Sequence, residues 1–94
     1  MEKIRNIQVE FFKTLSSIQE VAVYTALSEY KEGDSLEDLL FNATYEAICD
    51  ILVLIDGYKN DKLKLDLIDS ISKVSLKTGI QMHDMCADYL KYEK

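Results

Sequence analysis

Apolar residues recur at steps of three and four through the first third of the chain and form a single stripe. This spacing is the period of a helix with one buried face, so it predicts one long amphipathic helix over about residues 2–31. Gly33 is a suitable stop for that helix, because glycine adopts the left-handed backbone conformation at little cost. The stripe consists of Ile4, Ile7, Phe11, Leu15, Ile18, Ala22 and Ala26.

A second helix is predicted over about residues 36–57, and it is apolar on nearly every side. Ser35 and Asp38 have the spacing of a capping box, in which side-chain oxygens accept from free amides at the helix start. Asp34 and Glu37 have the same spacing. A helix this apolar is typical of the centre of a bundle, so we expect cover from the first helix, the last helix and a second copy of the chain. Its polar residues from position 42 onward are Asn42, Glu46, Asp50 and Asp56.

Residues 60–77 fit two different structures. The segment 62–67 alternates between polar and apolar residues, as a strand does, yet its leucines also continue into a helical stripe that ends at Val74. We favour the helix, because residues 70–73 contain no glycine, asparagine or proline to form a tight turn. A final helix is predicted over about residues 78–92, beginning after Thr78 and Gly79.

These elements predict a mainly α fold, a small three- to four-helix bundle that forms a single domain over residues 1–94. In this bundle the long first helix runs antiparallel to the middle helix, and the shorter last helix packs across both. Residues 60–77 are either a fourth helix or a short β-hairpin.

The negative charge of the chain is concentrated in one stretch. The net charge is −6, and residues 32–58 contain seven acidic residues and no basic one. Nucleic acids and anionic membrane surfaces are recognised by clustered lysine and arginine, whereas this chain has a single arginine, Arg5, and no basic cluster. We therefore expect neither nucleic acid nor membrane as a ligand, and instead another protein with a basic surface.

The candidate partner-binding residues lie where the first helix ends and the second begins. Tyrosine surrounded by carboxylates is a common composition for a recognition surface. A local explanation stays open, because acids in the first turn of a helix also offset its macrodipole and cap free amides. The candidate residues are Tyr30, Glu32, Asp34, Glu37 and Asp38.

Two other groups of residues are of types that bind metal ions. His83, Cys86 and Cys49 are zinc-ligand types, but a structural zinc site needs four ligands and no fourth is apparent. We expect no metal, no cofactor and no catalytic residue. The enzyme alternative is an all-helical, magnesium-dependent nucleotide pyrophosphohydrolase, although the Glu-x-x-Glu motif of that family is not reproduced. The carboxylates that would serve are Glu46, Asp50, Asp66 and Asp69.

The cell compartment follows from the N-terminus and the cysteines. The first residues are charged and lack a secretory signal, and no apolar run approaches the ~20 residues that span a bilayer. We expect a cytoplasmic protein with two reduced cysteines, and the excess of lysine over arginine is consistent with a bacterial or phage source. The size and charge suit an acidic inhibitor or immunity-type protein. A structural or regulatory homo-oligomer, such as a homodimer, is the second alternative.

Overall fold

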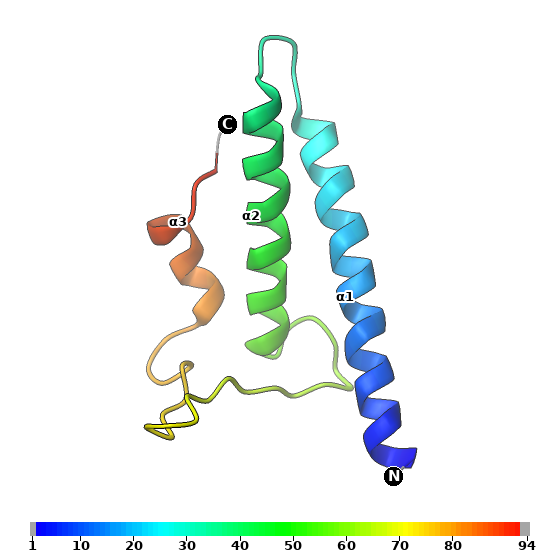
Figure 1. The fold of residues 1–94 in the computed structure, drawn as a ribbon, viewed down its shortest axis with the longest axis vertical. Helices are drawn as coiled ribbons and strands as arrows, with labels where there is room; N and C mark the ends of the chain where they lie inside the picture. The colour runs from blue at the N-terminus through cyan, green and yellow to red at the C-terminus, as the bar shows by residue number, and fades with distance from the viewer. Residues whose placement is uncertain (1, 93–94) are drawn as a thin grey trace.

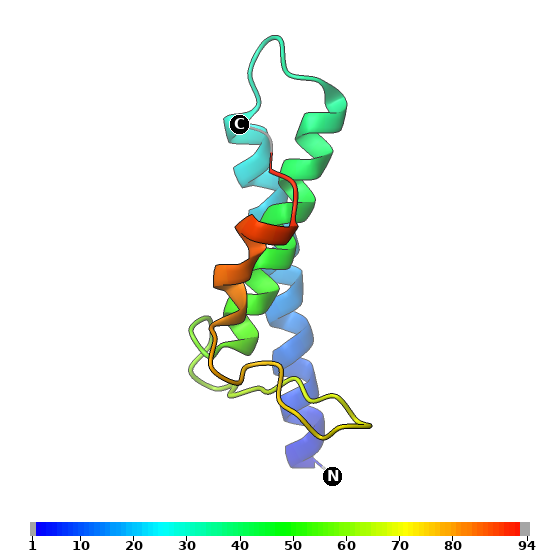
Figure 2. The same ribbon diagram turned by 90° about the vertical axis from the view of Figure 1, so that its left-hand side faces the viewer.

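The computed structural model describes residues 2–92, and the fold is mainly α, as the sequence predicts. The elements are α1 (Glu2–Glu29), α2 (Leu36–Ile55), the short 3-10 helix η1 (Met82–Met85) and α3 (Cys86–Tyr89), which continues directly from η1. Helix α2 lies in the middle, antiparallel to α1 on one side and with the C-terminal segment on the other (Figure 1). The view turned by 90° shows the same order of layers (Figure 2).

The best-buried part of the molecule is the C-terminal half of α2 and the part of α1 beside it. Ile18, Leu54 and Leu63 are at most 2% exposed, and they form the centre of the core. Ile18 belongs to the predicted stripe of α1, whose alanines at positions 22 and 26 are also buried, so that stripe is confirmed as a core face from Phe11 onward, whereas Ile7 is exposed. The N-terminal end of α1 extends beyond α2 (Figure 1), which leaves Ile4 58% exposed. Partly buried residues around the centre are Phe11, Leu15, Ile51 and Leu65.

Residues 60–77 contain no helix, so the favoured interpretation of this segment was wrong. The chain instead makes a hairpin-like turn with one antiparallel bridge, between Ile68 and Ser75, and no named strand. The carboxylate of Asp69 closes the turn by accepting from the backbone N–H of Ser72 at 2.8 Å and from its hydroxyl at 2.6 Å. Lys73 takes the left-handed conformation, with a φ of 66°. Asp69 and Lys73 therefore do what glycine or asparagine does in a more recognisable turn.

The C-terminal helical segment begins at Met82 rather than near residue 78, and it packs along α2 rather than across both long helices. Within the described residues, α1 and α3 share no contact. The residues that follow α3 do reach α1, because the Tyr92 hydroxyl donates to Glu29 Oε2 at 2.5 Å. The ring of Tyr92 also lies 4.7 Å from that of Tyr45 on α2, so the tail is attached to both long helices.

The molecule is elongated, with extents of 50 × 30 × 21 Å. Its radius of gyration is 15.4 Å, compared with ~12 Å for a compact domain of this length. Its accessible surface is 7095 Å², whereas a compact monomer of the same mass exposes about 5,500 Å². Large apolar side chains account for part of this surface on α1, at the start of α2 and on the hairpin-like turn.

Candidate functional site

All five residues predicted to bind a partner lie at one end of the long axis, where α1 turns into α2 (Figure 1). We call residues 30–41 the acidic tip. Gly33 takes the predicted left-handed conformation, with a φ of 96°, but it lies in the turn over residues 31–34, and α1 itself ends earlier, at Glu29. The turn is stabilised by its own side chains, because the backbone N–H of Lys31 donates to Asp34 Oδ2 at 2.9 Å. The Tyr30 hydroxyl donates to the Asp34 carbonyl at 3.0 Å, which fixes the tyrosine against the turn.

Helix α2 begins with the predicted capping box of Ser35 and Asp38. The Ser35 hydroxyl accepts from the backbone N–H of Asp38 at 3.0 Å, and Asp38 Oδ2 accepts from that of Ser35 at 3.2 Å. The alternative box of Asp34 with Glu37 does not form, since Asp34 bonds to Lys31 instead. Both aspartates therefore have a local structural role. Asp34 stabilises the turn, and Asp38 caps α2.

Glu32 and Glu37 differ from the two aspartates. Both are exposed, and neither makes a hydrogen bond or an ion pair with the part of the chain that the structure describes. No described lysine or arginine forms an ion pair with any acid of the tip. Local hydrogen bonds account for the carboxylates of the two aspartates. The two glutamates present theirs to solvent without an ion-pair partner, and Glu37 also lies in the first turn of α2, where its charge offsets the helix macrodipole.

Apolar side chains at the start of α2 lie beside these charges. Leu36 is 66% exposed and Leu40 is 58% exposed. A shallow depression in the same surface is lined by Glu37, Leu40, Phe41 and Thr44. The ring of Phe41 also carries the ammonium of Lys91, 4.6 Å from the ring centroid, so this surface already holds one cation from the chain's own tail.

The sequence did not reveal this apolar part of the tip. A helix that is apolar on nearly every side was expected to be covered by its neighbours. The cover is incomplete because the last helical segment is shorter than the predicted helix over about residues 78–92. A final segment of eight helical residues spans about 12 Å and cannot cover a 20-residue helix of about 30 Å.

A second polar cluster lies at the other end of α2, where Asp56 follows the helix. Its carboxylate is 3% exposed and accepts from the backbone N–H groups of Met82 at 3.1 Å and His83 at 2.9 Å. It also bonds to Nδ1 of the His83 ring at 2.6 Å. Tyr58 packs edge-on against that ring, with the centroids 6.0 Å apart. These bonds attach the start of η1 to the end of α2.

The pKa of Asp56 reflects two opposing effects. Burial is the largest and raises it, but the backbone and side-chain bonds from His83 and the amide of Met82 together hold the pKa below its ordinary value. The charged carboxylate is therefore the form that the fold stabilises. Both ring nitrogens of His83 face carboxylates, since Nε2 lies 3.5 Å from Asp84 Oδ1, so the ring is not positioned to activate a nucleophile.

The two cysteines face each other between α2 and the C-terminal segment. Both are free, and Cys86 is buried while Cys49 is partly exposed. Burial and a hydrogen bond with Cys86 raise the pKa of Cys49 to about 11. A thiol with that pKa stays protonated at neutral pH and is a poor nucleophile or metal ligand.

The carboxylates considered as magnesium ligands lie on different elements. Asp50 on α2 pairs with Lys59 at 3.3 Å, whereas Asp66 and Asp69 lie in the hairpin-like turn. The serine hydroxyls at positions 75 and 72 bond to those two carboxylates. Among residues 2–92, no group of three or more His, Cys, Asp or Glu side chains lies close enough to hold a metal ion.

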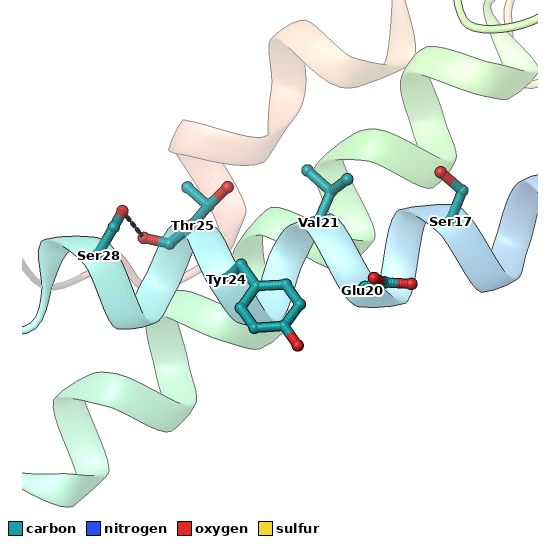
Figure 3. A pocket seen from close by; sticks show the side chains of 6 residues that line it. All are labelled: Ser17, Glu20, Val21, Tyr24, Thr25 and Ser28. Carbon is teal, nitrogen blue, oxygen red and sulfur yellow. Dashed lines mark hydrogen bonds between the residues drawn. The ribbon is translucent and has the colours of Figure 1, made fainter.

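Two further depressions are shallow and lie on α1. Figure 3 shows one of them, and all the side chains that line it come from this single helix. A second lies nearer the N-terminus and includes Arg5, Phe12 and Lys13. A depression formed by one helix cannot enclose a small molecule, so these are features of a helix surface.

Comparison with protein-family models, with curated proteins and with solved structures finds no match for this chain. None of the helices in the described range 2–92 is long and apolar enough to cross a bilayer.

Proposed function

We propose that this chain is a small protein-binding module whose acidic tip docks on a basic surface of another protein, in the manner of an acidic inhibitor or immunity-type protein. The observation that carries the proposal is the pairing of uncompensated carboxylates with exposed apolar side chains. Glu32 and Glu37 point to solvent, and Leu36 and Leu40 lie beside them on the first turns of α2.

Each component of this surface has a distinct physical role in recognition. Apolar side chains that become buried on binding supply affinity, at about 25 cal/mol per Å² of apolar area removed from water. Carboxylates at the rim attract a basic partner, raise the association rate and select against acidic surfaces. Exposed charges are screened over ~8–10 Å at physiological ionic strength, so the interaction is expected to weaken with added salt.

The charge of the tip is tested by reversing the two glutamates that form no local hydrogen bond. The variant Glu32→Lys/Glu37→Lys leaves both partners of the capping box and the Asp34 bond in place. The matched control is Asp61→Lys/Asp88→Lys, which makes the same change in net charge at exposed positions outside the tip. The wild-type protein, both variants and Leu40→Ala are each immobilised and exposed to lysate of the source cell at low salt.

We expect a protein that elutes with salt from the wild type and from the control but is not captured by the Glu32/Glu37 variant. Capture by Leu40→Ala should be weaker than capture by the wild type, because an apolar anchor has been removed. The proposal fails if every salt-eluted protein is retained equally by the tip variant and the control. In that case the carboxylates of the tip serve only the turn and the helix start.

A further inference from the structure

The side of α1 that does not face α2 carries a second regular stripe, which the core does not use. Val9, Phe12, Ser16, Gln19 and Val23 are all exposed and are separated by alternating steps of three and four residues. This alternation is the spacing of a helix that packs against another helix over several turns. Phe12 is 64% exposed, the most of these apolar residues, and Val9 and Val23 are 45% and 43% exposed. We call these five residues the outer seam.

The part of the outer seam from Phe12 to Val23 is self-complementary when it is read in the opposite direction, and Val9 lies beyond this matched part. A two-fold axis between residues 17 and 18 relates Phe12 to the level of Val23, and Ser16 to that of Gln19. An isologous dimer requires this property, because each copy offers the same surface and residue pairs occur twice. We propose that two copies of this chain associate through their α1 helices, packed antiparallel along the outer seam about this axis.

The contacts of such a pair are chemically matched along its length. Phe12 of each copy packs on Val23 of the other, near both ends of the contact. At the centre the small Ser16 allows close approach, and its hydroxyl lies at the level of the Gln19 amide of the other copy. Polar pairs at the centre of a helix interface fix its register and orientation. Apolar ends with a polar centre thus specify the antiparallel arrangement.

Charge supports the same arrangement. Lys13 and Glu20 lie next to the outer seam, on the same side of it, and Figure 3 shows Glu20 on the open surface of α1. Neither residue forms an ion pair with any other described residue. In the antiparallel pair, Lys13 of each copy lies within about two residues of the level of Glu20 of the other. Two opposite-charge contacts therefore flank the two-fold axis.

The molecule exposes more surface than a compact monomer of its mass, as a protein that dimerises would. The surface of 7095 Å² exceeds that of a compact monomer by about 1,500 Å². A standard interface takes about 800 Å² from each partner. One interface of that size would remove about half of the excess. A second copy is favoured over an unrelated partner because the outer seam matches itself in both apolar pattern and charge.

The first test is the molar mass of the intact chain in solution by sedimentation equilibrium. We expect a dimer of twice 10.8 kDa at a concentration of about 100 µM, where a micromolar Kd gives mostly dimer. Phe12→Glu/Val23→Glu should give a monomer with unchanged helical circular dichroism, since both side chains are exposed. The matched control, Ile71→Glu/Val74→Glu on the hairpin-like turn, adds the same charge at exposed apolar positions and should remain dimeric.

The second test examines the antiparallel orientation of the two α1 helices by exchanging the charges of Lys13 and Glu20. Lys13→Glu and Glu20→Lys each place like charges opposite each other twice, so each should weaken the dimer about tenfold. The double variant Lys13→Glu/Glu20→Lys should restore wild-type association. Positions 13 and 20 are seven residues apart on one helix, about 10 Å along its axis, so the restoration cannot come from a contact within one chain.

Three outcomes would overturn the inference. They are a wild-type monomer at about 100 µM, where micromolar affinity would be seen, a dimer that survives Phe12→Glu/Val23→Glu, and a double charge exchange that fails to restore association. The acidic tip is unaffected by these variants, because none of the substituted residues belongs to it. Failure of the dimer and failure of the proposed partner binding are therefore distinguishable.

Discussion

The two halves of α2 have similar apolar character but very different cover. Leu54 near its C-terminal end is fully buried, whereas Leu36 and Leu40 near its N-terminal end are more than half exposed. Ile18 of α1 and Leu63 pack against Leu54 in the core. The start of η1 is bonded to Asp56, which directly follows the same end of α2. At the N-terminal end α2 has α1 on one side and only the tail of the chain on the other.

This difference shows that burial depends on how much chain is available at each level of the molecule. Helix α2 is about 30 Å long, and the chain after it contributes a hairpin-like turn and eight helical residues. These cover one half of the helix well and leave the other half open. Stability is thus concentrated at the closed half, and exposed apolar surface at the open half.

The largest expected effect is the loss of core packing at the closed half. Leu54→Ala should lower the free energy of unfolding by about 3–4 kcal/mol, because the side chain is fully buried and leaves a cavity. Leu40→Ala removes the same atoms at the open half and should cost less than ~1 kcal/mol. Urea denaturation measures both. Equal losses would show that the two halves are covered alike.

The next effect concerns the carboxylate that attaches η1 to α2. Asp56→Asn keeps the size of the side chain but removes the charge that accepts three hydrogen bonds, and should cost about 2 kcal/mol at neutral pH. The folded-state pKa of Asp56 lies below its ordinary value of 3.8. Its contribution is therefore complete above pH ~4 and is lost as the pH falls through the lower folded-state pKa.

Urea denaturation of the wild type and Asp56→Asn between neutral and acidic pH measures this loss. Asp66 and Asp69 also have lowered pKa values, so the informative quantity is the difference between the two proteins. That difference should shrink as the pH falls below ~4. A difference independent of pH would contradict a stabilising role for the charged carboxylate.

A smaller effect is expected at the start of α2, where local bonds rather than packing hold the chain. Ser35→Ala removes one half of the capping box and should cost about 1 kcal/mol. Ser70→Ala, which removes the same hydroxyl at an exposed position outside the helices, is the control and should have little effect. A double-mutant cycle with Asp38→Ala should show coupling, since the two residues share the box.

The smallest effect is expected for the two solvent-directed glutamates. Glu32→Gln/Glu37→Gln should change the free energy of unfolding by about 0.5 kcal/mol, because neither side chain forms a hydrogen bond or an ion pair and only Glu37 offsets the macrodipole of α2. The measurement is again urea denaturation, compared with Ser35→Ala. A loss as large as that of the cap variant would mean that these carboxylates support the fold, and would weaken the case for a binding surface.

Local signals predicted the first half of this chain correctly. Apolar periodicity located α1 and α2 to within two residues at each end. Gly33 indicated the turn that follows α1, and Ser35 with Asp38 indicated the start of α2. All of these features depend on residues close together in sequence. The same holds for the acidic residues of the tip, which lie within one turn and the start of one helix.

The second half depends on contacts between distant residues, and there the sequence was less informative. The turn at residues 69–74 uses an aspartate and a left-handed lysine, neither of which has the strong signature of glycine. The late start at Met82 follows from its bond to Asp56, 26 residues earlier. The exposure of Leu36 and Leu40 likewise depends on where residues 82–92 stop covering α2.

The bond between Tyr92 and Glu29 joins residues 63 positions apart. During synthesis the α1–α2 pair can form as soon as residue 55 is available, because its contacts are between neighbouring helices. The flank of α2 that carries Phe41 and Tyr45 must then stay uncovered until residues 91 and 92 have been made. A newly made chain is therefore exposed to wrong associations up to that point, and a chain cut short before residue 91 keeps that exposure permanently.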